Sequence, residues 1–199
     1  MPFLVPTTNE TKTPKFYIVR GAAPHLGISF TVKKMAQSFL KQNKKVLVFD
    51  ALLGLKNFPV NNKNAKKIPQ VLQKKLALTE IITKECGFDI LAGSADQNLT
   101  TLSLSEQQYL KLCLVQLAKN YDVILIDMPF QVLTPIWEDL GENLWIISSD
   151  KNVIINTLMA GQKKQPLHLI VNQQKAACPL NQLYIFVKSL CPECQITLL

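Results

Sequence analysis

Residues 16–50 read FYIVRGAAPHLGISFTVKKMAQSFLKQNKKVLVFD, and this stretch decides the fold. A short apolar, β-branched run at residues 16–20 ends at Gly21, and a second apolar run, Val46–Asp50, ends on an acid. Between them, apolar side chains recur at the i, i+3, i+4, i+7 and i+8 spacing of an amphipathic helix: Val32, Met35, Ala36, Phe39 and Leu40. The order strand, loop, helix, strand predicts a βαβ unit with parallel strands that are covered on both faces.

The rest of the chain continues this alternation. Further strands are predicted at residues 88–92, 123–127, 143–148 and 167–171, with a last apolar run at 195–199. Ser103 and Glu106 form a capping box ahead of a long helix, Asp150 precedes a helix to about residue 160, and a last helix lies near 182–189. We therefore expect a flexible N-terminal segment at 1–14, followed by one doubly wound, mostly parallel α/β domain at 15–199.

Composition excludes two protein classes. Of the 199 residues, 48% are hydrophobic and 18% charged, which is ample for a core and unlike a disordered chain. No stretch approaches the roughly 18 apolar residues of a membrane span, and the polar N-terminus lacks the apolar core of a secretory signal. The five cysteines are odd in number and widely scattered, so we expect a reduced, cytoplasmic protein.

The positive charge comes from lysine. Lys+Arg 22 against Asp+Glu 14 gives a net charge of +8, and Arg20 is the only arginine. Proteins that read base edges depend on the planar guanidinium, which this chain cannot supply as a set. Diffuse lysines can attract phosphate backbones or anionic lipid, or they can simply keep the chain soluble. For the lysine-rich segment 56–75, with Lys63, Lys66, Lys67, Lys74 and Lys75, a partner-binding surface and a solvated face both stay open.

The first loop of the predicted sheet is the candidate ligand site. Ligands of doubly wound sheets bind outside the carboxyl ends of the strands, where the strand order reverses. A phosphate-binding loop needs glycines, a lysine for the phosphate charge and a Ser or Thr hydroxyl for Mg²⁺. Gly21, Gly27 and Ser29 fit this pattern, but Ile28 occupies the lysine position. On its spacing alone, this loop is weak evidence for nucleotide binding.

Segments along most of the chain resemble one family. The sequence VLVFDALLGLKN at residues 46–57 is similar to the second-strand segment of the MinD/ParA family of deviant Walker ATPases, most closely its flagellar-number-regulator branch. Residues 88–94, 121–127, 144–149 and 168–172 resemble four further family segments in the same order. This resemblance spans about residues 16–175 and implies a P-loop NTPase-like α/β fold.

The resemblance also assigns site positions. It places the family's nucleotide-binding residues at Gly21, Gly27, Ser29, Asp50, Asp127 and Asn172, the last being the family's adenine-reading asparagine. It places the P-loop lysine at Ile28, the signature lysine that reaches across the dimer at Ala23, and the second-strand catalytic acid at Leu52. Because each lost charge weakens phosphate binding or transition-state stabilisation, we expect a pseudo-ATPase without catalytic residues, a metal site or a nucleotide cofactor. Two alternatives for Asp50 and Asp127 stay open. These acids could bind Mg-ATP or Mg-ADP weakly, or they could only cap neighbouring helices or hydrogen-bond the backbone of the loop.

Three functions follow from this resemblance. The first is a regulatory or protein-interaction module that binds a protein partner in flagellar placement or polar cell organisation, with a homodimer as a further option. The second is a weak nucleotide-binding switch that dimerises, and the third is a non-specific DNA-associated protein of the partition type. No basic amphipathic helix follows the last apolar run, so the membrane anchor used by some family members is not expected.

Two other features leave their roles open. Cys191 and Cys194 form a CxxC pattern, which occurs in redox pairs and in halves of zinc sites but also by coincidence. A structural zinc site needs four ligands, and only Cys178 lies nearby in the sequence. His25 in the first loop is either an anion or partner contact or an ordinary exposed side chain.

Overall fold

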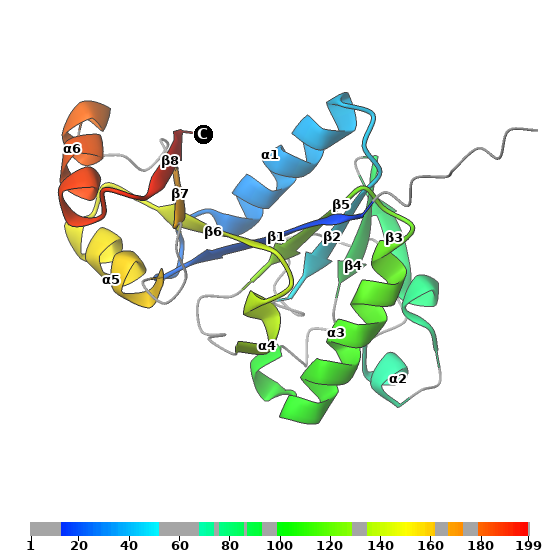
Figure 1. Ribbon diagram of the computed structural model, residues 1–199. Coiled ribbons are helices and arrows are strands. Elements are labelled where there is room, and N and C mark those ends of the chain that lie inside the picture. Colours follow the sequence, from blue (N-terminus) through cyan, green and yellow to red (C-terminus); the bar gives the residue numbers. More distant parts are fainter. Residues whose placement is uncertain are drawn as a thin grey trace, which may run out of the picture.

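A computed structural model describes residues 13–51, 68–73, 76–85, 87–92, 99–128, 135–161, 167–172 and 179–198 (Figure 1). The described chain forms one eight-stranded sheet in the order β3-β4-β2-β5-β1-β6-β7-β8, in which only β3 runs antiparallel to its neighbour. The strands are β1 (Lys15–Gly21), β2 (Val46–Asp50), β3 (Ile82–Glu85), β4 (Phe88–Ala92), β5 (Val123–Asp127), β6 (Glu142–Ile147), β7 (His168–Val171) and β8 (Gln195–Leu198). The predicted fold class, a mostly parallel doubly wound sheet, is confirmed.

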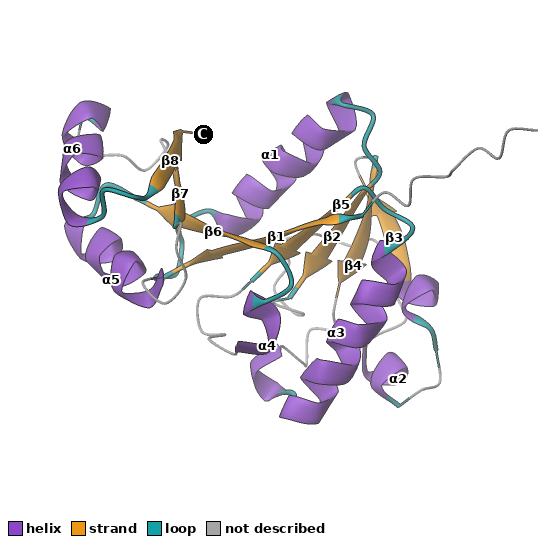
Figure 2. Cartoon of the chain, in the orientation of Figure 1, coloured by secondary structure: helices purple, strands orange, loops and turns teal. Residues whose placement is uncertain are grey.

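Helices cover both faces of the sheet (Figure 2). The helices are α1 (Ile28–Lys41), α2 (Ile68–Leu72), α3 (Leu104–Ala118), α4 (Pro135–Glu138), α5 (Lys151–Gly161) and α6 (Leu180–Leu190), with short 3-10 turns η1 (Leu78–Ile81) and η2 (Leu99–Thr101). α1 packs on one face, where Val19 and Val48 join its buried side chains. Ile18 and Phe49 point to the opposite face, where α2, α3 and α4 pack, and α5 and α6 cover that same face beyond β6.

Short-range sequence patterns predict where most of these helices and strands begin and end. The capping box of α3 is present, because the Glu106 amide donates to Ser103 Oγ and the Ser103 amide donates to Glu106 Oε2 at 2.8 Å. The carboxylate of Asp150 accepts from the Asn152 amide at 2.8 Å at the start of α5. The sequence analysis missed β3, whose letters ITKE are too polar and too few for a strand pattern. This short edge strand forms through its hairpin with β4 across Gly87, which has a φ of +90°.

The loop that follows β1 lies where the direction of winding reverses. From β1 the chain continues to β2, two positions away on one side, and later returns to β6 directly on the other side. β5 fills the position between β2 and β1, so the carboxyl ends of β1, β2 and β5 are adjacent. These three strand ends carry the β1–α1 loop, Asp50 and Asp127 respectively.

Several predictions fall on residues that are not described. Residues 1–12 of the expected N-terminal segment lie outside the described ranges, as do Leu52, Cys178 and most of segment 56–75 with all five of its named lysines. Within that segment, the described residues Ile68–Leu72 form the short helix α2. No helix in the described residues is long and apolar enough to cross a membrane.

Candidate functional site

The β1–α1 loop ends at a glycine with a left-handed backbone. Gly27 has a φ of +81°, and its carbonyl accepts the first helical hydrogen bond, from the Thr31 amide at 2.9 Å. A side chain at Gly27 would also collide with a neighbour, because a Cβ there would lie 2.5 Å from Asn172 Nδ2. Gly27 is therefore required both by its backbone conformation and by the close approach of Asn172.

Asn172 ties the end of β7 to this loop. It is 4% exposed, and its side-chain amide donates to the Leu26 carbonyl oxygen at 2.9 Å. The resemblance assigned this asparagine to adenine recognition. In this structure its amide holds the loop that precedes α1, so it positions the candidate site from the neighbouring strand.

Apolar side chains pack beneath the loop. Leu26 is buried, while Ala23 and Ile28 are partly buried against the cluster under α1. A Cβ at Gly21 would lie 2.7 Å from Leu26 Cδ1 and 3.3 Å from Ile28 Cδ1. Ile28, which the resemblance assigns to the P-loop lysine position, therefore packs against the core, and Gly21 leaves room for it.

The loop offers fewer backbone donors than a glycine-rich one. Pro24 lies within it and has no N–H group to direct at a phosphate. His25 adopts a positive φ of 59°, and its side chain is exposed. The loss of this donor can be read from the sequence, because proline has no backbone N–H group wherever it stands.

Two acids stand side by side at the ends of β2 and β5. Asp50 and Asp127 are direct partners in the parallel register, and they are 2% and 0% exposed. The Ala51 amide donates to the Asp127 carbonyl oxygen at 3.1 Å, so the two strand ends are fastened together. In the described part of the chain, neither carboxylate oxygen of Asp127 has a donor in full hydrogen-bonding geometry.

Burial dominates the ionisation of Asp127. Desolvation raises its pKa to about 6, and the nearby Ser29 hydroxyl and Lys33 ammonium act in the opposite direction. Ser29 and Lys33 are four residues apart on α1, so they share one face of the helix. The structure thus brings together Ser29, Asp50 and Asp127, and it adds Lys33, which the sequence patterns did not single out.

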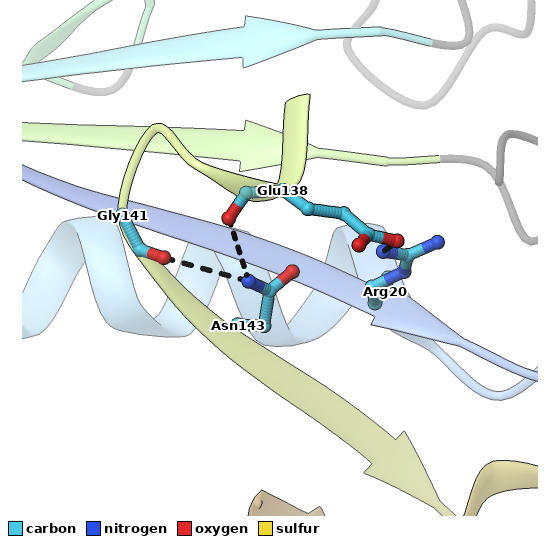
Figure 3. Close-up of polar contacts among 4 residues, drawn as sticks. All are labelled: Arg20, Glu138, Gly141 and Asn143. Atoms are coloured by element: carbon cyan, nitrogen blue, oxygen red, sulfur yellow. Dashed lines mark hydrogen bonds and ion pairs between the residues drawn. The ribbon is translucent and has the colours of Figure 1, made fainter. Parts of the chain in front are cut away.

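Arg20 forms a buried ion pair at the base of the loop. It is 3% exposed, and its Nη1 lies 3.3 Å from Glu138 Oε1 (Figure 3). Its guanidinium lies over the ring of Trp145, 4.5 Å from the ring centre. Burial lowers the pKa of Arg20, and Glu138 opposes that shift. Asn143 donates to the carbonyl oxygens of Glu138 at 3.2 Å and Gly141 at 3.4 Å, which holds the end of α4 (Figure 3). The only arginine is thus a structural residue that joins β1, β6 and α4.

The other candidates lie away from this loop. Cys191 and Cys194 are joined in a disulfide, so the expectation of fully reduced cysteines is wrong for this pair. Cys113, on α3, forms no disulfide and packs, partly buried, against the core cluster on that face of the sheet. The described residues contain no cluster of three or more His, Cys, Asp or Glu side chains that could hold a metal ion.

Comparison with known proteins places the fold. No protein-family profile matches the chain, and no curated protein sequence matches it. Solved structures do match over most of its length. The MinC:MinD cell division protein complex of Aquifex aeolicus aligns with a TM-score of 0.70 and 16% identity, covering 92% of this chain and 79% of that chain.

Two further structures agree with this match. The Cyanothece McdA–ATP complex aligns with a TM-score of 0.71 and 15% identity, covering 94% of this chain and 83% of that chain. The cell division ATPase MinD of Pyrococcus furiosus aligns with a TM-score of 0.67 and 14% identity, covering 87% and 79%. The chain therefore has the fold of the MinD/ParA-type P-loop ATPases.

Proposed function

We propose that this protein is a catalytically inactive relative of the MinD/ParA-type ATPases that acts as a protein-interaction or regulatory module. The observation that carries this proposal is the position and packing of Ile28. The resemblance puts it in the P-loop lysine position, and its partly buried side chain packs against the apolar cluster under α1. A hydrocarbon side chain cannot stabilise the charge of a transferring phosphoryl group, which is the main task of the lysine in this fold.

The other departures support the same conclusion. Ala23 offers no charge to a partner's nucleotide, and Leu52 offers no carboxylate after β2. Pro24 removes one backbone donor from the loop. Asp127, which would face Mg²⁺ in an ATPase of this fold, is fully buried, and this burial raises its pKa to about 6.

A protein partner is favoured by exposed apolar side chains. Tyr184, Ile185 and Leu190 on α6 are 52%, 67% and 49% exposed, and Leu198 on β8 is 51% exposed. Large apolar side chains gathered on neighbouring elements often mark a protein-binding surface. One structural neighbour is itself a MinC:MinD complex, which shows that this fold can bind a protein partner. A role in flagellar placement or polar organisation rests only on the resemblance of residues 46–57.

A weak Mg-nucleotide switch is the second candidate, because Ser29, Asp50 and Asp127 still meet at the loop. Substitution separates the two functions. We expect Ile28→Lys combined with Ala23→Lys and Leu52→Asp to bind Mg-ATP measurably in calorimetry, whereas the unaltered chain does not. Gln37→Lys adds a positive charge on the exposed side of α1 and serves as the control for general attraction of an anion.

The proposal is wrong if the unaltered chain hydrolyses ATP in a manner that Asp127→Asn abolishes. Micromolar binding without hydrolysis would instead support the nucleotide switch. Retardation of DNA that disappears between about 50 and 200 mM salt would support the third function, non-specific association with DNA.

A further inference from the structure

The CPEC sequence at residues 191–194 forms the turn that joins α6 to β8. Cys191 and Cys194 are disulfide-bonded, with their Cα atoms 5.6 Å apart. The turn also has its own backbone hydrogen bonds, since the Cys194 amide donates to the Cys191 carbonyl at 3.2 Å and the Cys191 amide donates to Val187 at 2.9 Å. These bonds do not involve sulfur, so they can keep the two thiols adjacent after reduction.

The two sulfurs differ in their access to solvent. Cys194 is 1% exposed and lies in the apolar cluster that includes Leu183 and Val187 of α6. Cys191 is half-buried at the rim of that cluster. An external thiol or disulfide can therefore reach the first cysteine but not the second. In a reversible cysteine pair, the outer residue exchanges with the reactant and the inner one closes the ring.

A fixed positive charge accompanies the pair. The Lys188 ammonium donates to the carbonyl oxygens of Pro192 at 2.8 Å and Cys194 at 2.7 Å. These two bonds hold the charge against the turn. A neighbouring cation favours the thiolate, which is the reactive form of cysteine.

We propose that Cys191 and Cys194 form a reversible thiol–disulfide exchange site for low-molecular-weight thiols and disulfides of the glutathione class. In oxidation, the Cys191 thiolate attacks one sulfur of the small disulfide, and one small thiolate leaves. The Cys194 thiolate then attacks Cys191 Sγ in this mixed disulfide and displaces the second small thiolate. Two electrons pass from the protein dithiol to the small disulfide, and the two cysteine protons end on the released thiols. Reduction is the reverse sequence.

The disulfide lies directly before β8, a strand at one edge of the described sheet. Gln195, the residue after Cys194, begins β8, and its amide donates to the Leu167 carbonyl at 2.8 Å. β8 pairs only with β7 in the described sheet. Opening the disulfide therefore removes one covalent restraint from the turn that leads into β8, while the backbone hydrogen bonds of the turn remain.

The test uses the full chain with Cys86, Cys113 and Cys178 replaced by serine, so that only the pair remains. The protein is equilibrated in buffers of varied reduced-to-oxidised glutathione ratio, quenched in acid, alkylated with a maleimide and analysed by mass. We expect the same oxidised fraction from either starting state, and a smooth change with the ratio. A pair that stays reduced in excess oxidised glutathione, or that opens only when the chain is unfolded, would overturn the proposal.

Single variants test the assigned roles. With Cys194→Ser, the remaining Cys191 should form a mixed disulfide with glutathione at least about tenfold faster than Cys194 does in the Cys191→Ser variant. Equal rates in the two folded variants, checked by circular dichroism, contradict the assignment. Lys188→Met should slow the reaction of Cys191 several-fold, while Lys34→Met on α1 should leave the rate unchanged.

Discussion

The side-chain amide of Asn172 donates a hydrogen bond to the carbonyl oxygen of Leu26 at 2.9 Å, which links the end of β7 to the loop before α1. The two residues are 146 positions apart in the chain. The contact also explains the glycine at position 27, because any Cβ there would collide with the same amide. The shape of the candidate site is thus set from a strand two places away in the sheet.

Asn172→Ala should therefore destabilise the protein and loosen the loop. Losing a buried hydrogen bond and leaving the Leu26 carbonyl unsatisfied costs about 1–3 kcal/mol in the free energy of unfolding. Urea denaturation measures that loss, and hydrogen exchange should show faster exchange at the amides of residues 26–29. Asn152→Ala, at an exposed position on α5, is the control and should change little. Equal losses in both variants would contradict the linking role.

Asp127→Asn should stabilise the protein at neutral pH. The folded-state pKa of Asp127 is raised to about 6, so the folded protein binds the proton more tightly than the unfolded chain does. Its contribution to stability is therefore fully present below about pH 4 and is lost as the pH rises through about 6. A shift of this size corresponds to roughly 3 kcal/mol of lost stability at neutral pH. The uncharged amide of Asn should recover this free energy, reduced by the cost of burying its own unpaired N–H and C=O groups.

The measurement for Asp127 is urea denaturation from about pH 4 to pH 8. The difference between Asp127→Asn and the unaltered chain should grow from about pH 4 to about pH 6 and level off above that. Glu193→Gln removes an exposed carboxylate and should show no such dependence. A constant difference across the window would refute the assigned pKa.

Gln107→Ala should lower the free energy of unfolding more than Gln108→Ala does. Gln107 is 5% exposed, accepts from Trp137 Nε1 at 3.1 Å, and donates to the Leu99 and Leu102 carbonyls at 3.0 and 3.1 Å. Its loss leaves a buried indole N–H and two carbonyls unsatisfied, for which we expect about 2–4 kcal/mol. Gln108→Ala, on the exposed side of α3, should cost less than about 0.5 kcal/mol in the same denaturation experiment.

Removing the Glu138 carboxylate alone should lower the free energy of unfolding more than removing both members of its ion pair with Arg20. Glu138→Gln leaves the Arg20 guanidinium, 3% exposed, without its carboxylate. We expect a loss of about 2–4 kcal/mol, less than for a fully buried pair because Glu138 is 26% exposed. Arg20→Met with Glu138→Gln should recover part of that loss. A double-mutant cycle by thermal or urea unfolding tests this, and strictly additive losses would contradict the ion pair's coupling.

Local sequence signals predicted most of the fold and part of the site. β2 and β5 are apolar runs that end on acids, so Asp50 and Asp127 could be placed at one sheet edge without knowing any contact. The register that makes them direct partners was not visible in either run. Ser29 could be placed at the start of α1, and the i, i+4 spacing of Ser29 and Lys33 already puts both on one face of that helix.

The remaining features depend on contacts between distant residues. Arg20 and Glu138 are 118 positions apart, and α4 has only four residues, too short for a periodic pattern. The inward packing of Ile28 follows from the phase of α1 against the sheet, which the missing lysine alone did not reveal. The disulfide between Cys191 and Cys194 required the turn geometry, because a CxxC pattern is equally compatible with free thiols.

Calorimetric titration of the unaltered chain with Mg-ATP at near-physiological salt tests the central claim most directly. We expect no detectable binding up to about 1 mM nucleotide, because Ile28 supplies no charge and packs against the apolar cluster beneath the loop. Saturable binding with a micromolar Kd, lost in Ser29→Ala and Asp127→Asn, would contradict it and establish a nucleotide site with a different phosphate clamp.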